Sequence, residues 1–572
     1  MIKNIFLIID KKSKKSIYLL LFVMLTVMLM EVISLGLIIP VLSVVLDPAT
    51  VNYYLDSYFL GIIFENELLP VFLLSGLIIA FLVKSLIIFF MNWKQNKIMY
   101  EINTGLARFF YNAYLSSNYN FHLENNSSKM IRNISSEISI VTSLINSICL
   151  VVSEIVVLVG ISIFLFFYNP WATLLTSLIL ILLGLILFLV VKKRLNILGI
   201  LRKKHEKLRF KNLINGLRGI KEVIISNYQK SFVEDYDKHH KGVFKTSLYR
   251  NVLMPIPRLS FEFSGVLILS LFTLAGLYLN YSSVELITVL SVWAVAAIRL
   301  LPSYNRISSN LQNIVSSKSA LDELTKDFIN FKNEKNKKDN LIEKESNLST
   351  FKNIYFKNIS FSYLGAEKKI IKDVNFKIKI GSKIAIIGDS GSGKTTLLDL
   401  VLGLIKPQNG EILIDEKNIE NHLKGWQKNI GYVPQKIYLT DDTIKKNIAF
   451  GVPESEINVM KIERAIRLAQ LNNFINSLNR GIDTIVGEDG IKISGGQRQR
   501  IGIARALYRD PLVLVLDEAT NALDEETENT LLTDLIKSNN DRTIIMVSHR
   551  QSALKDFNSI LSVKNGSITQ IK

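Results

Sequence analysis

Long runs of apolar residues fill the first half of the chain, whereas short runs alternate with charged residues in the second half. A helix of about 20 apolar residues can cross the ~30 Å hydrocarbon core of a bilayer. Runs of that length occur near residues 16–46, 70–92, 142–168, 171–191, 259–280 and 284–304. From residue 351 onward, short β-rich runs alternate with helical stretches, which indicates an α/β domain with a mostly parallel sheet. The pattern therefore predicts an α-helical six-span transmembrane domain followed by an α/β domain.

Lys and Arg are distributed unequally among the links between the apolar runs. The links at residues 47–69, 169–170 and 281–283 contain neither residue, whereas residues 93–141 and 192–258 are rich in both. Because positive residues are retained on the cytoplasmic side of a membrane, we predict that both termini and the α/β domain are cytoplasmic. The two basic segments also carry periodic apolar residues, so we expect helices that extend beyond the membrane.

Composition places the boundaries of the domains. The transmembrane domain is predicted at residues 1–326, and the α/β domain at residues 351–572. Between them, residues 327–350 are charged and poor in aromatic residues, which predicts a flexible linker. The sequence holds one α/β domain of this kind.

The net charge of +18 does not by itself identify a partner. Lys and Arg concentrate in the links between apolar runs and in the linker, which is the pattern of membrane topology, so we predict no nucleic-acid partner. The single cysteine, Cys149, lies within an apolar run. One cysteine excludes an intrachain disulfide and a cysteine-based metal site.

A glycine-rich loop follows the strand-like run KIAIIG and precedes the helix-like run TLLDLVLGL. The loop consists of Gly388, Asp389, Ser390, Gly391, Ser392, Gly393, Lys394, Thr395 and Thr396. This spacing between a strand and a helix is typical of a phosphate-binding loop, whose backbone amides and helix N-terminus attract phosphate oxygens. We expect Lys394 to reach the terminal phosphates of ATP and the Thr395 hydroxyl to bind Mg²⁺. The α/β domain is therefore predicted to be a P-loop NTPase domain.

Two adjacent carboxylates, Asp517 and Glu518, end the apolar run LVLVLDE. Neighbouring side chains of an extended strand point in different directions, so one carboxylate can bind the metal while the other activates the attacking water. We assign Mg²⁺ to Asp517 and the attacking water to Glu518. The sequence thus predicts ATP hydrolysis.

Further motifs resemble those of ABC ATPases. The run ISGGQRQR at residues 493–500 is similar to the signature motif of that family, which implies nucleotide contacts by Ser494, Gly495, Gly496 and Gln497. The resemblance also implies that Tyr363 stacks on adenine, Gln435 serves the metal and catalysis, Asp524 belongs to the D-loop, and His549 is the catalytic switch histidine. Ile493 and Asn521 stand where leucine and serine are usual, and neither departure removes a phosphate contact.

The signature of one ABC domain completes the ATP site of a second domain. Since this chain has one such domain, the resemblance implies a homodimer, with Ser494, Gly495 and Gly496 facing the γ-phosphate at Lys394 of the partner subunit. Pairing with a different half-transporter is the alternative. A membrane half followed by an ATPase half, with long inner loops, resembles the exporters of this family.

The membrane half looks most like bacterial flippases for lipid-linked oligosaccharides of the PglK type. The resemblance lies in the runs at residues 30–48, 255–262 and 298–307. It implies ATP-driven flipping of a polyisoprenyl-pyrophosphate oligosaccharide across the bacterial inner membrane, as protein glycosylation requires. Alternatives are a multidrug exporter, an exporter of other lipids, and an ATP-gated channel or regulator.

Four ionisable residues lie at similar depth in the expected spans: Glu31, Lys84, Glu154 and Arg299. Charges inside a membrane are costly and mark functional candidates. One interpretation is that they form structural ion pairs. The other follows from the resemblance to the flippases: Lys84, Arg258, Arg299 and Arg306 line a substrate cavity and attract a pyrophosphate group, which suits the guanidinium fork. Glu262 lies one helical turn from Arg258.

Overall fold

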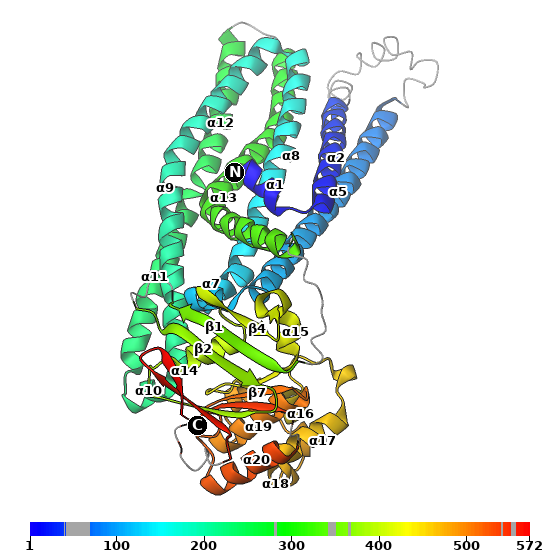
Figure 1. Cartoon of the computed structure of the whole chain (residues 1–572). Coiled ribbons are helices and arrows are strands. Elements are labelled where there is room, and N and C mark those ends of the chain that lie inside the picture. Colours follow the sequence, from blue (N-terminus) through cyan, green and yellow to red (C-terminus); the bar gives the residue numbers. More distant parts are fainter. Residues whose placement is uncertain are drawn as a thin grey trace. The chain divides into compact units, whose positions relative to one another are not determined.

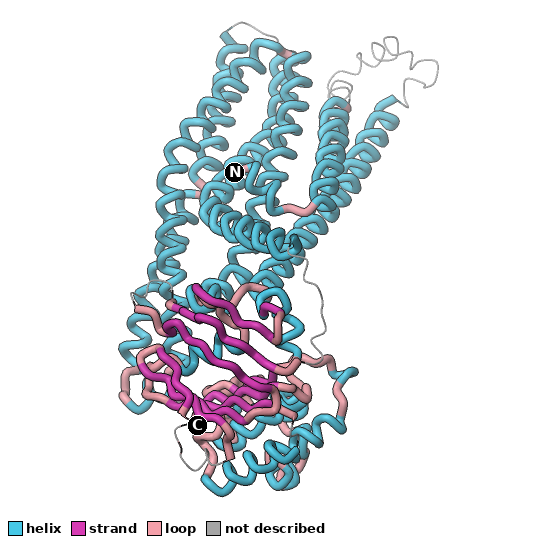
Figure 2. The backbone as a smooth tube through the Cα atoms, viewed as in Figure 1, coloured by secondary structure: helices cyan, strands magenta, loops and turns pink. Residues whose placement is uncertain are grey.

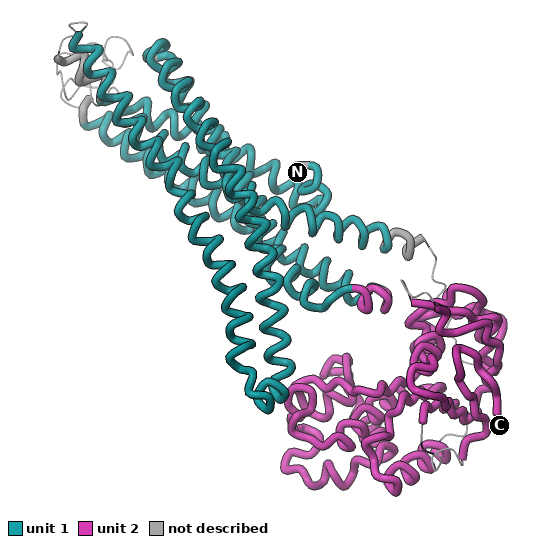
Figure 3. The backbone as a smooth tube through the Cα atoms, turned by 90° about the vertical axis from the view of Figure 1, so that its left-hand side faces the viewer, with its two compact units in different colours: residues 1–117, 125–335 teal, residues 118–124, 336–572 magenta. Residues whose placement is uncertain are grey.

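The computed structural model describes residues 1–38, 41, 69–278, 283–340, 351–363, 368–538, 541–548, 550 and 556–571. The chain divides into two compact units (Figure 3). The first comprises Met1–Ser117 and Asn125–Lys335, and the second comprises Asn118–Glu124 and Asn336–Lys572. In the part of the chain that the structure describes, the first unit is helical and the strands all lie in the second (Figure 2).

The first unit is built mainly from long helices (Figure 1). They are α1 (Ile2–Ile8), α2 (Lys11–Gly36), α5 (Leu69–Leu115), α7 (Ser127–Arg132), the π-helical turn η2 (Asn133–Glu137), α8 (Ile138–Tyr168), α9 (Pro170–Arg218), α10 (Ile220–Ile225), α11 (Gln229–Leu253), α12 (Ile256–Tyr278) and α13 (Ser283–Asn340). Many of their apolar side chains are exposed, among them Phe89, Leu189 and Leu271. Helices with apolar residues all round fit a membrane environment.

Five segments among the described residues are long and apolar enough to cross a membrane. They are Lys11–Gly36, Val71–Leu115, Ser127–Phe167, Pro170–Arg218 and Gln229–Tyr278, and they contain or overlap the first five predicted apolar runs. The sixth run, residues 284–304, lies within α13, where several side chains fall outside the described residues. The multi-pass helical domain is confirmed, while the count of six spans stays a prediction.

Helix α13 continues into the segment predicted to be a flexible linker. It ends at Asn340, so only residues 341–350 of that segment lie outside the described residues. Phe328 and Phe331 are 9% and 7% exposed, and their ring centroids lie 6.4 and 6.3 Å from that of Phe110 on α5. The prediction of a flexible linker from residue 327 was wrong because aromatic packing stabilises a helix whose composition favoured disorder.

The second unit contains two sheets. The larger has the strand order β10-β9-β3-β8-β7-β6, and its strands are parallel except for the antiparallel β10. Its strands are β3 (Lys383–Ile387), β6 (Ile430–Val433), β7 (Val513–Asp517), β8 (Thr543–Val547), β9 (Ser559–Lys564) and β10 (Ser567–Gln570). The smaller sheet is antiparallel and consists of β1 (Asn353–Phe361), β2 (Ile371–Lys379), β4 (Asn409–Ile414) and β5 (Lys417–Asn418).

The second unit also contains several helices. They include α14 (Lys394–Val401), α15 (Leu423–Lys428), α16 (Ile444–Ile448), α17 (Val459–Leu468), α18 (Asn472–Asn476), α19 (Gly495–Tyr508) and α20 (Glu525–Ser538), while α6 (Tyr119–Glu124) is grouped with this unit. Of these helices, α14 and α19 contact the larger sheet. Every residue of β7 and β8 is buried, because strands covered on both faces are continuously apolar. One buried cluster includes Ile501 and Leu531, and another includes Leu397 and Trp426.

Candidate functional site

The predicted ATP site lies at one edge of the larger sheet. Because β3, β8, β7 and β6 are neighbouring parallel strands, their carboxyl ends meet at that edge, where open α/β sheets bind their ligands. Gly388 directly follows β3, Gln435 follows β6, and Glu518 follows β7. The fold therefore gathers candidate residues from segments that are far apart in the sequence.

The glycine-rich loop between β3 and α14 adopts a backbone that favours glycine. Gly391 and Gly393 have φ angles of +76° and +107°, a region that residues with a Cβ rarely enter. At Gly388, an added Cβ would lie 2.4 Å from the carbonyl oxygen of Val563. The loop can thus curl tightly enough to turn its amides toward a phosphate.

The polar side chains of the loop fit a phosphate group. Lys394 is 7% exposed, and its Nζ donates to the carbonyl oxygens of Gly388 and Asp389, each at 2.8 Å. The Oγ of Ser392 is buried without a hydrogen-bond partner. An orphaned hydroxyl of this kind calls for a ligand, and a phosphate oxygen would satisfy it. Thr395 is exposed on the first turn of α14, where its hydroxyl is free to serve Mg²⁺.

Asp517, the last residue of β7, is 5% exposed. Burial raises the pKa of its carboxyl to about 6, with a further contribution from the charge of Glu518, while Lys394 acts in the opposite direction. A buried carboxylate with little compensating charge fits a divalent cation. Asp517 and Thr395 would hold Mg²⁺, which neutralises charge on the phosphate oxygens when bound.

Glu518 is half-buried and held by two amide side chains. Its Oε2 accepts hydrogen bonds from Gln435 Nε2 at 2.7 Å and from Asn521 Nδ2 at 3.0 Å. The structure thus brings together Glu518 and Gln435, two of the predicted catalytic residues. Asn521 also contacts this carboxylate directly. In the sequence, Asn521 is notable only because serine is usual at its position.

The signature residues begin helix α19. Ser494 caps the helix through a reciprocal pair of hydrogen bonds with Gln497, at 3.2 and 2.9 Å. Gly496 packs closely, since a Cβ there would lie 3.1 Å from the carbonyl oxygen of Ala522. Within the described residues, neither a hydrogen bond nor an ion pair links residues 494–497 to the phosphate loop. The signature residues are therefore available to contact a nucleotide at a different ATP site.

The three remaining predicted residues of this domain, Asp524, Tyr363 and His549, differ in their structural surroundings. Asp524 caps α20 by accepting from the backbone and side chain of Thr527, both at 2.9 Å, and these bonds lower the pKa of its carboxyl. Tyr363 is half-buried, with its hydroxyl 3.4 Å from Thr396 Oγ1. His549 lies outside the described residues, two positions after the end of β8.

One buried carboxyl group of this site was not identified from the sequence. Asp399 lies inside α14 and is 7% exposed, and burial together with the charge of Asp517 raises its pKa to about 6. The available signal was a lone acidic residue in the apolar run TLLDLVLGL. Burial and Asp517, with a contribution from Asp399, also raise the pKa of Tyr432 on β6.

The charges of the membrane half are paired in the structure. Glu31 Oε2 lies 2.8 Å from Lys84 Nζ, and its Oε1 pairs with Arg299. Glu154 accepts from Ser303 Oγ at 2.7 Å and from Arg306 Nη1 at 2.8 Å. Three of the four residues predicted at one depth are therefore joined, whereas Glu154 pairs with Arg306.

Arg258 stands apart from these pairs. It is exposed and donates from Nε to Glu262 Oε1 at 2.8 Å, as their spacing of one helical turn suggested. Lys84, Arg299 and Arg306 face only Glu31 and Glu154 among the ion pairs of the described residues. These two ion-paired groups together contain three cations and two carboxylates.

A multi-pass helical domain joined to a P-loop ATPase domain with a signature motif defines an ATP-binding membrane transporter. The chain matches the family model "ABC transporter" over residues 371–521 and the model "ABC transporter transmembrane region" over residues 16–297. The chain belongs to the ABC transporters. ATPase domains of this family use ATP with Mg²⁺, and the residues described above fit both.

Similar proteins carry the name ATP-dependent lipid A-core flippase. That of Pectobacterium atrosepticum is 40% identical over 216 residues, which are 38% of this chain and 37% of that protein. That of Wigglesworthia glossinidia brevipalpis is 29% identical over 490 residues, 84% of this chain and 81% of that protein.

Among solved structures, the chain resembles a bacterial Atm1-family ABC exporter with ATP bound. The TM-score is 0.76 at 20% sequence identity, and the match covers 98% of this chain and 96% of that chain. At this identity the likeness establishes the fold, which is that of an exporter with a transmembrane half and an ATPase half.

Proposed function

We propose that two copies of this chain form an ATP-driven exporter that flips a lipid with a phosphate-bearing head group, a polyisoprenyl-pyrophosphate oligosaccharide, from the inner to the outer leaflet. The membrane is the bacterial inner membrane, with both termini and the ATPase domain in the cytoplasm. The observation that carries the proposal is the surplus of positive charge in the ion-paired groups of the membrane half. The flippase names of the relatives support movement of a lipid.

The charge surplus centres on Glu31. This carboxylate is 2% exposed and forms ion pairs with both Lys84 and Arg299, whose side chains are 16% and 21% exposed. Since one carboxylate neutralises one cation, a positive charge remains in a region where charge is costly. A pyrophosphate group would offset it, and the guanidinium fork of Arg299 can bind phosphate oxygens in pairs. Arg258 and Arg306 would extend the attraction toward the cytoplasmic boundary.

ATP hydrolysis would drive the transport. In this proposal Lys394 and the loop amides hold the β- and γ-phosphates, and Tyr363 stacks on adenine. Glu518 accepts a proton as a water oxygen bonds to the γ-phosphorus and the bond to the ADP oxygen breaks. Gln435 and His549 orient the water and the phosphate. Ser494 and Gly495 of each chain complete the site at Lys394 of the partner subunit, so hydrolysis is linked to closure of the homodimer.

A second candidate substrate is lipid A-core, the molecule in the printed names of the relatives. It would make this chain an exporter of another lipid, which was an alternative from the sequence. A multidrug exporter lacks a specific supporting observation.

Reconstituted full-length protein would test the proposal. Vesicles would hold a labelled polyisoprenyl-pyrophosphate glycan, and its transfer between leaflets would be followed with and without ATP. We expect ATP-dependent transfer that falls by about tenfold in Arg299→Ala and less in the exposed Arg258→Ala, since tenfold corresponds to roughly 1.4 kcal/mol of lost interaction. The exposed Arg218→Ala serves as the control.

Other results would contradict the proposal. Transfer of lipid A-core but not of the glycan would favour the second candidate. Normal transfer by Arg299→Ala would assign the charges to structure alone. Hydrolysis that no lipid stimulates, together with passive ion flux, would indicate a gated channel.

A further inference from the structure

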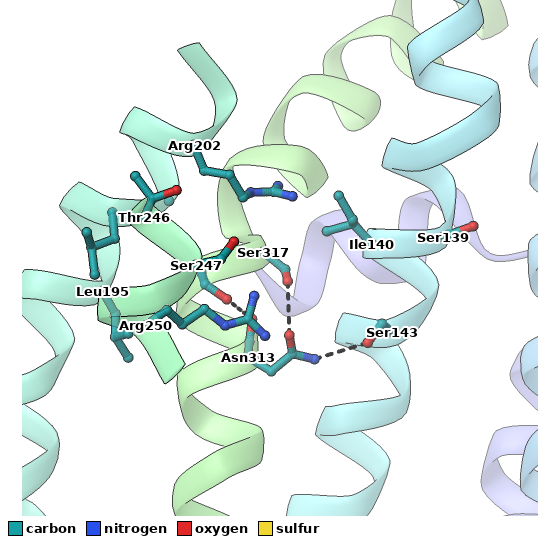
Figure 4. Close-up of a pocket in the computed structure, with 13 residues that line it drawn as sticks. Ser139, Ile140, Ser143, Leu195, Arg202, Thr246, Ser247, Arg250, Asn313 and Ser317 are labelled. Atoms are coloured by element: carbon teal, nitrogen blue, oxygen red, sulfur yellow. Dashed lines mark hydrogen bonds between the residues drawn. The ribbon is translucent and has the colours of Figure 1, made fainter. Parts of the chain in front are cut away.

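A cavity of about 230 Å³ lies inside the first unit, between α8, α9, α11 and α13 (Figure 4). Its polar lining includes Ser143, Arg202, Ser247, Arg250, Asn313 and Ser317, one or more from each helix. The apolar part includes Leu195. None of the residues in the proposed ATP site or in the ion-paired groups around Glu31 and Glu154 lines it.

The cavity lies beyond the apolar runs. On α9 its lining residues follow the run that ends near residue 191, and on α11 they precede the run that begins near residue 259. On α13 they follow the run that ends near residue 304. The polar lining residues lie roughly 14–20 Å along their helices beyond these runs, at 1.5 Å per residue, on the side where the helices α9 and α11 extend into the basic segments.

The side chains that line the cavity carry two positive charges, of which that of Arg250 is unpaired among the described residues. Arg202 and Arg250 are close enough for their charges to interact, and both side chains reach into the space between the helices (Figure 4). Arg250 is half-buried and makes neither a hydrogen bond nor an ion pair with the residues that the structure describes. Arg202 contacts Glu206 on its own helix at 3.4 Å and is close enough to Glu137 for their charges to interact, while the lining itself contains no carboxylate. Two neighbouring guanidinium groups, of which only Arg202 has carboxylates nearby, favour an anion between them.

Hydroxyl and amide groups complete the lining. Asn313 Nδ2 donates to Ser143 Oγ at 3.1 Å and to Ser147 Oγ at 2.8 Å, while its Oδ1 accepts from Ser317 Oγ at 3.4 Å. These bonds fix the amide of Asn313. Because Ser143 accepts in this network, its own hydroxyl proton remains available to an oxyanion.

We infer that this cavity is a binding site for a phosphoryl oxyanion, held between Arg202 and Arg250 with hydrogen bonds from the serine hydroxyls. The phosphoryl group belongs either to a lipid head group or to a soluble phosphate compound, since both present the same oxygens. The site does not depend on the proposed transport substrate, because its residues differ from Lys84, Arg258, Arg299 and Arg306.

Two binding measurements on the full-length chain separate the two sources. Inorganic pyrophosphate is titrated calorimetrically in neutral detergent, in a Lys394→Ala, Arg299→Ala background that weakens phosphate binding at the ATP site and at the proposed substrate cavity. Retention of phosphatidylglycerol is counted by native mass spectrometry after reconstitution in mixed phosphatidylcholine and phosphatidylglycerol vesicles. We expect Arg250→Gln to weaken binding at least about tenfold, or 1.4 kcal/mol, in one of the two measurements. The exposed Arg218→Gln is the matched control and should change neither.

The pattern of loss identifies the ligand. Loss of pyrophosphate binding alone assigns a soluble phosphate compound, and loss of phosphatidylglycerol alone assigns a lipid head group. Ser247→Asp places a carboxylate beside the arginines, so it should abolish the same binding even if Arg250→Gln fails to fold. Arg250→Lys, which keeps the charge, should restore part of it. Unchanged binding of both probes in folded Ser247→Asp would overturn the inference.

Discussion

Glu518 combines backbone strain with a fixed carboxylate. Its φ angle of +49° lies in the left-handed region, which a residue with a Cβ adopts at a cost of about 1–3 kcal/mol and which is concentrated at functional sites. The turn comes directly after the buried strand β7, and Gln435 and Asn521 hold the carboxylate there. The chain thus stabilises one orientation of the group that we assign to the attacking water.

Replacing Glu518 by Gln should separate ATP binding from turnover. The amide can occupy the same place, but it cannot accept the proton of the water, so we expect ATP hydrolysis to fall at least about a hundredfold while ATP binding is retained. Binding and phosphate release would be measured on the same preparation. The exposed Glu416→Gln should behave as wild type. Hydrolysis at the wild-type rate in Glu518→Gln would remove Glu518 from this role.

Replacing Asp399 by Asn should stabilise the nucleotide-free protein, and the gain should depend on pH. The pKa of Asp399 rises from 3.8 to about 6 on folding, so the folded state holds a proton that the unfolded state releases. Stability therefore decreases as pH rises between these values, and the loss persists above pH 6. At about 1.4 kcal/mol per pKa unit, Asp399→Asn should gain roughly 2–3 kcal/mol at pH 7.5 and little below pH 4.

Thermal unfolding of the full-length protein across this pH range would check the Asp399 prediction. The exposed Asp441→Asn provides the comparison, because removal of a solvated carboxylate should shift the melting temperature little at any pH. A gain that stays constant from pH 4 to 7.5 would show that charge is not the cause.

The ATP-site residues differ in how far the sequence could locate them. Lys394, Asp517 and Glu518 belong to contiguous motifs, so the sequence alone indicates which of them bind phosphate, metal and water. Asp399 has no such spacing, because its burial and its proximity to Asp517 arise only when α14 packs on the sheet. The pairing of Glu31 with both Lys84 and Arg299 likewise required the arrangement of three helices, since the sequence left open which charges meet.

At the scale of elements, continuous apolar runs located β3 and β7 correctly because strands buried on both faces need them. The tail of α13 was missed for the opposite reason. Lys and Asn dominate its composition, yet Phe328 and Phe331 fall on the face that meets α5. Two well-placed aromatic side chains outweigh the average polarity of the segment.

Truncating Phe331 should therefore destabilise the first unit. Its ring lies 5.5 Å from that of Tyr114 and 6.3 Å from that of Phe110, so Phe331→Ala removes a buried aromatic side chain and should cost about 3 kcal/mol. Thermal unfolding in detergent measures the loss. Ile329→Ala, at a neighbouring position that is 38% exposed, should cost far less. Equal effects of the two variants would mean that the helix tail packs differently.

At the scale of the whole molecule, the order of the two halves could be read from the sequence, because membrane and soluble composition differ so strongly. That one chain leaves its ATP site incomplete was implied only by the resemblance to ABC ATPases, and not by composition or local spacing. The described part of one chain has no hydrogen bond between the signature and its own phosphate loop, and the signature residues Ser494 and Gly495 are exposed. Their predicted task depends on a second chain.

Mixed dimers of two inactive variants should recover ATP hydrolysis. Lys394→Ala disables the phosphate loop, and Gly495→Asp places a negative charge where the partner's γ-phosphate would bind. A Cβ at Gly495 meets only the Cβ of Ala522 at 3.6 Å, so the substitution should leave its own domain folded. If sites form between chains, a mixed dimer has one doubly defective site and one intact site, and we expect up to about half of the wild-type rate. If each site formed within one chain, both would carry a defect and hydrolysis would stay at the level of the single variants. Purification through two different tags, followed by phosphate release, distinguishes the two arrangements.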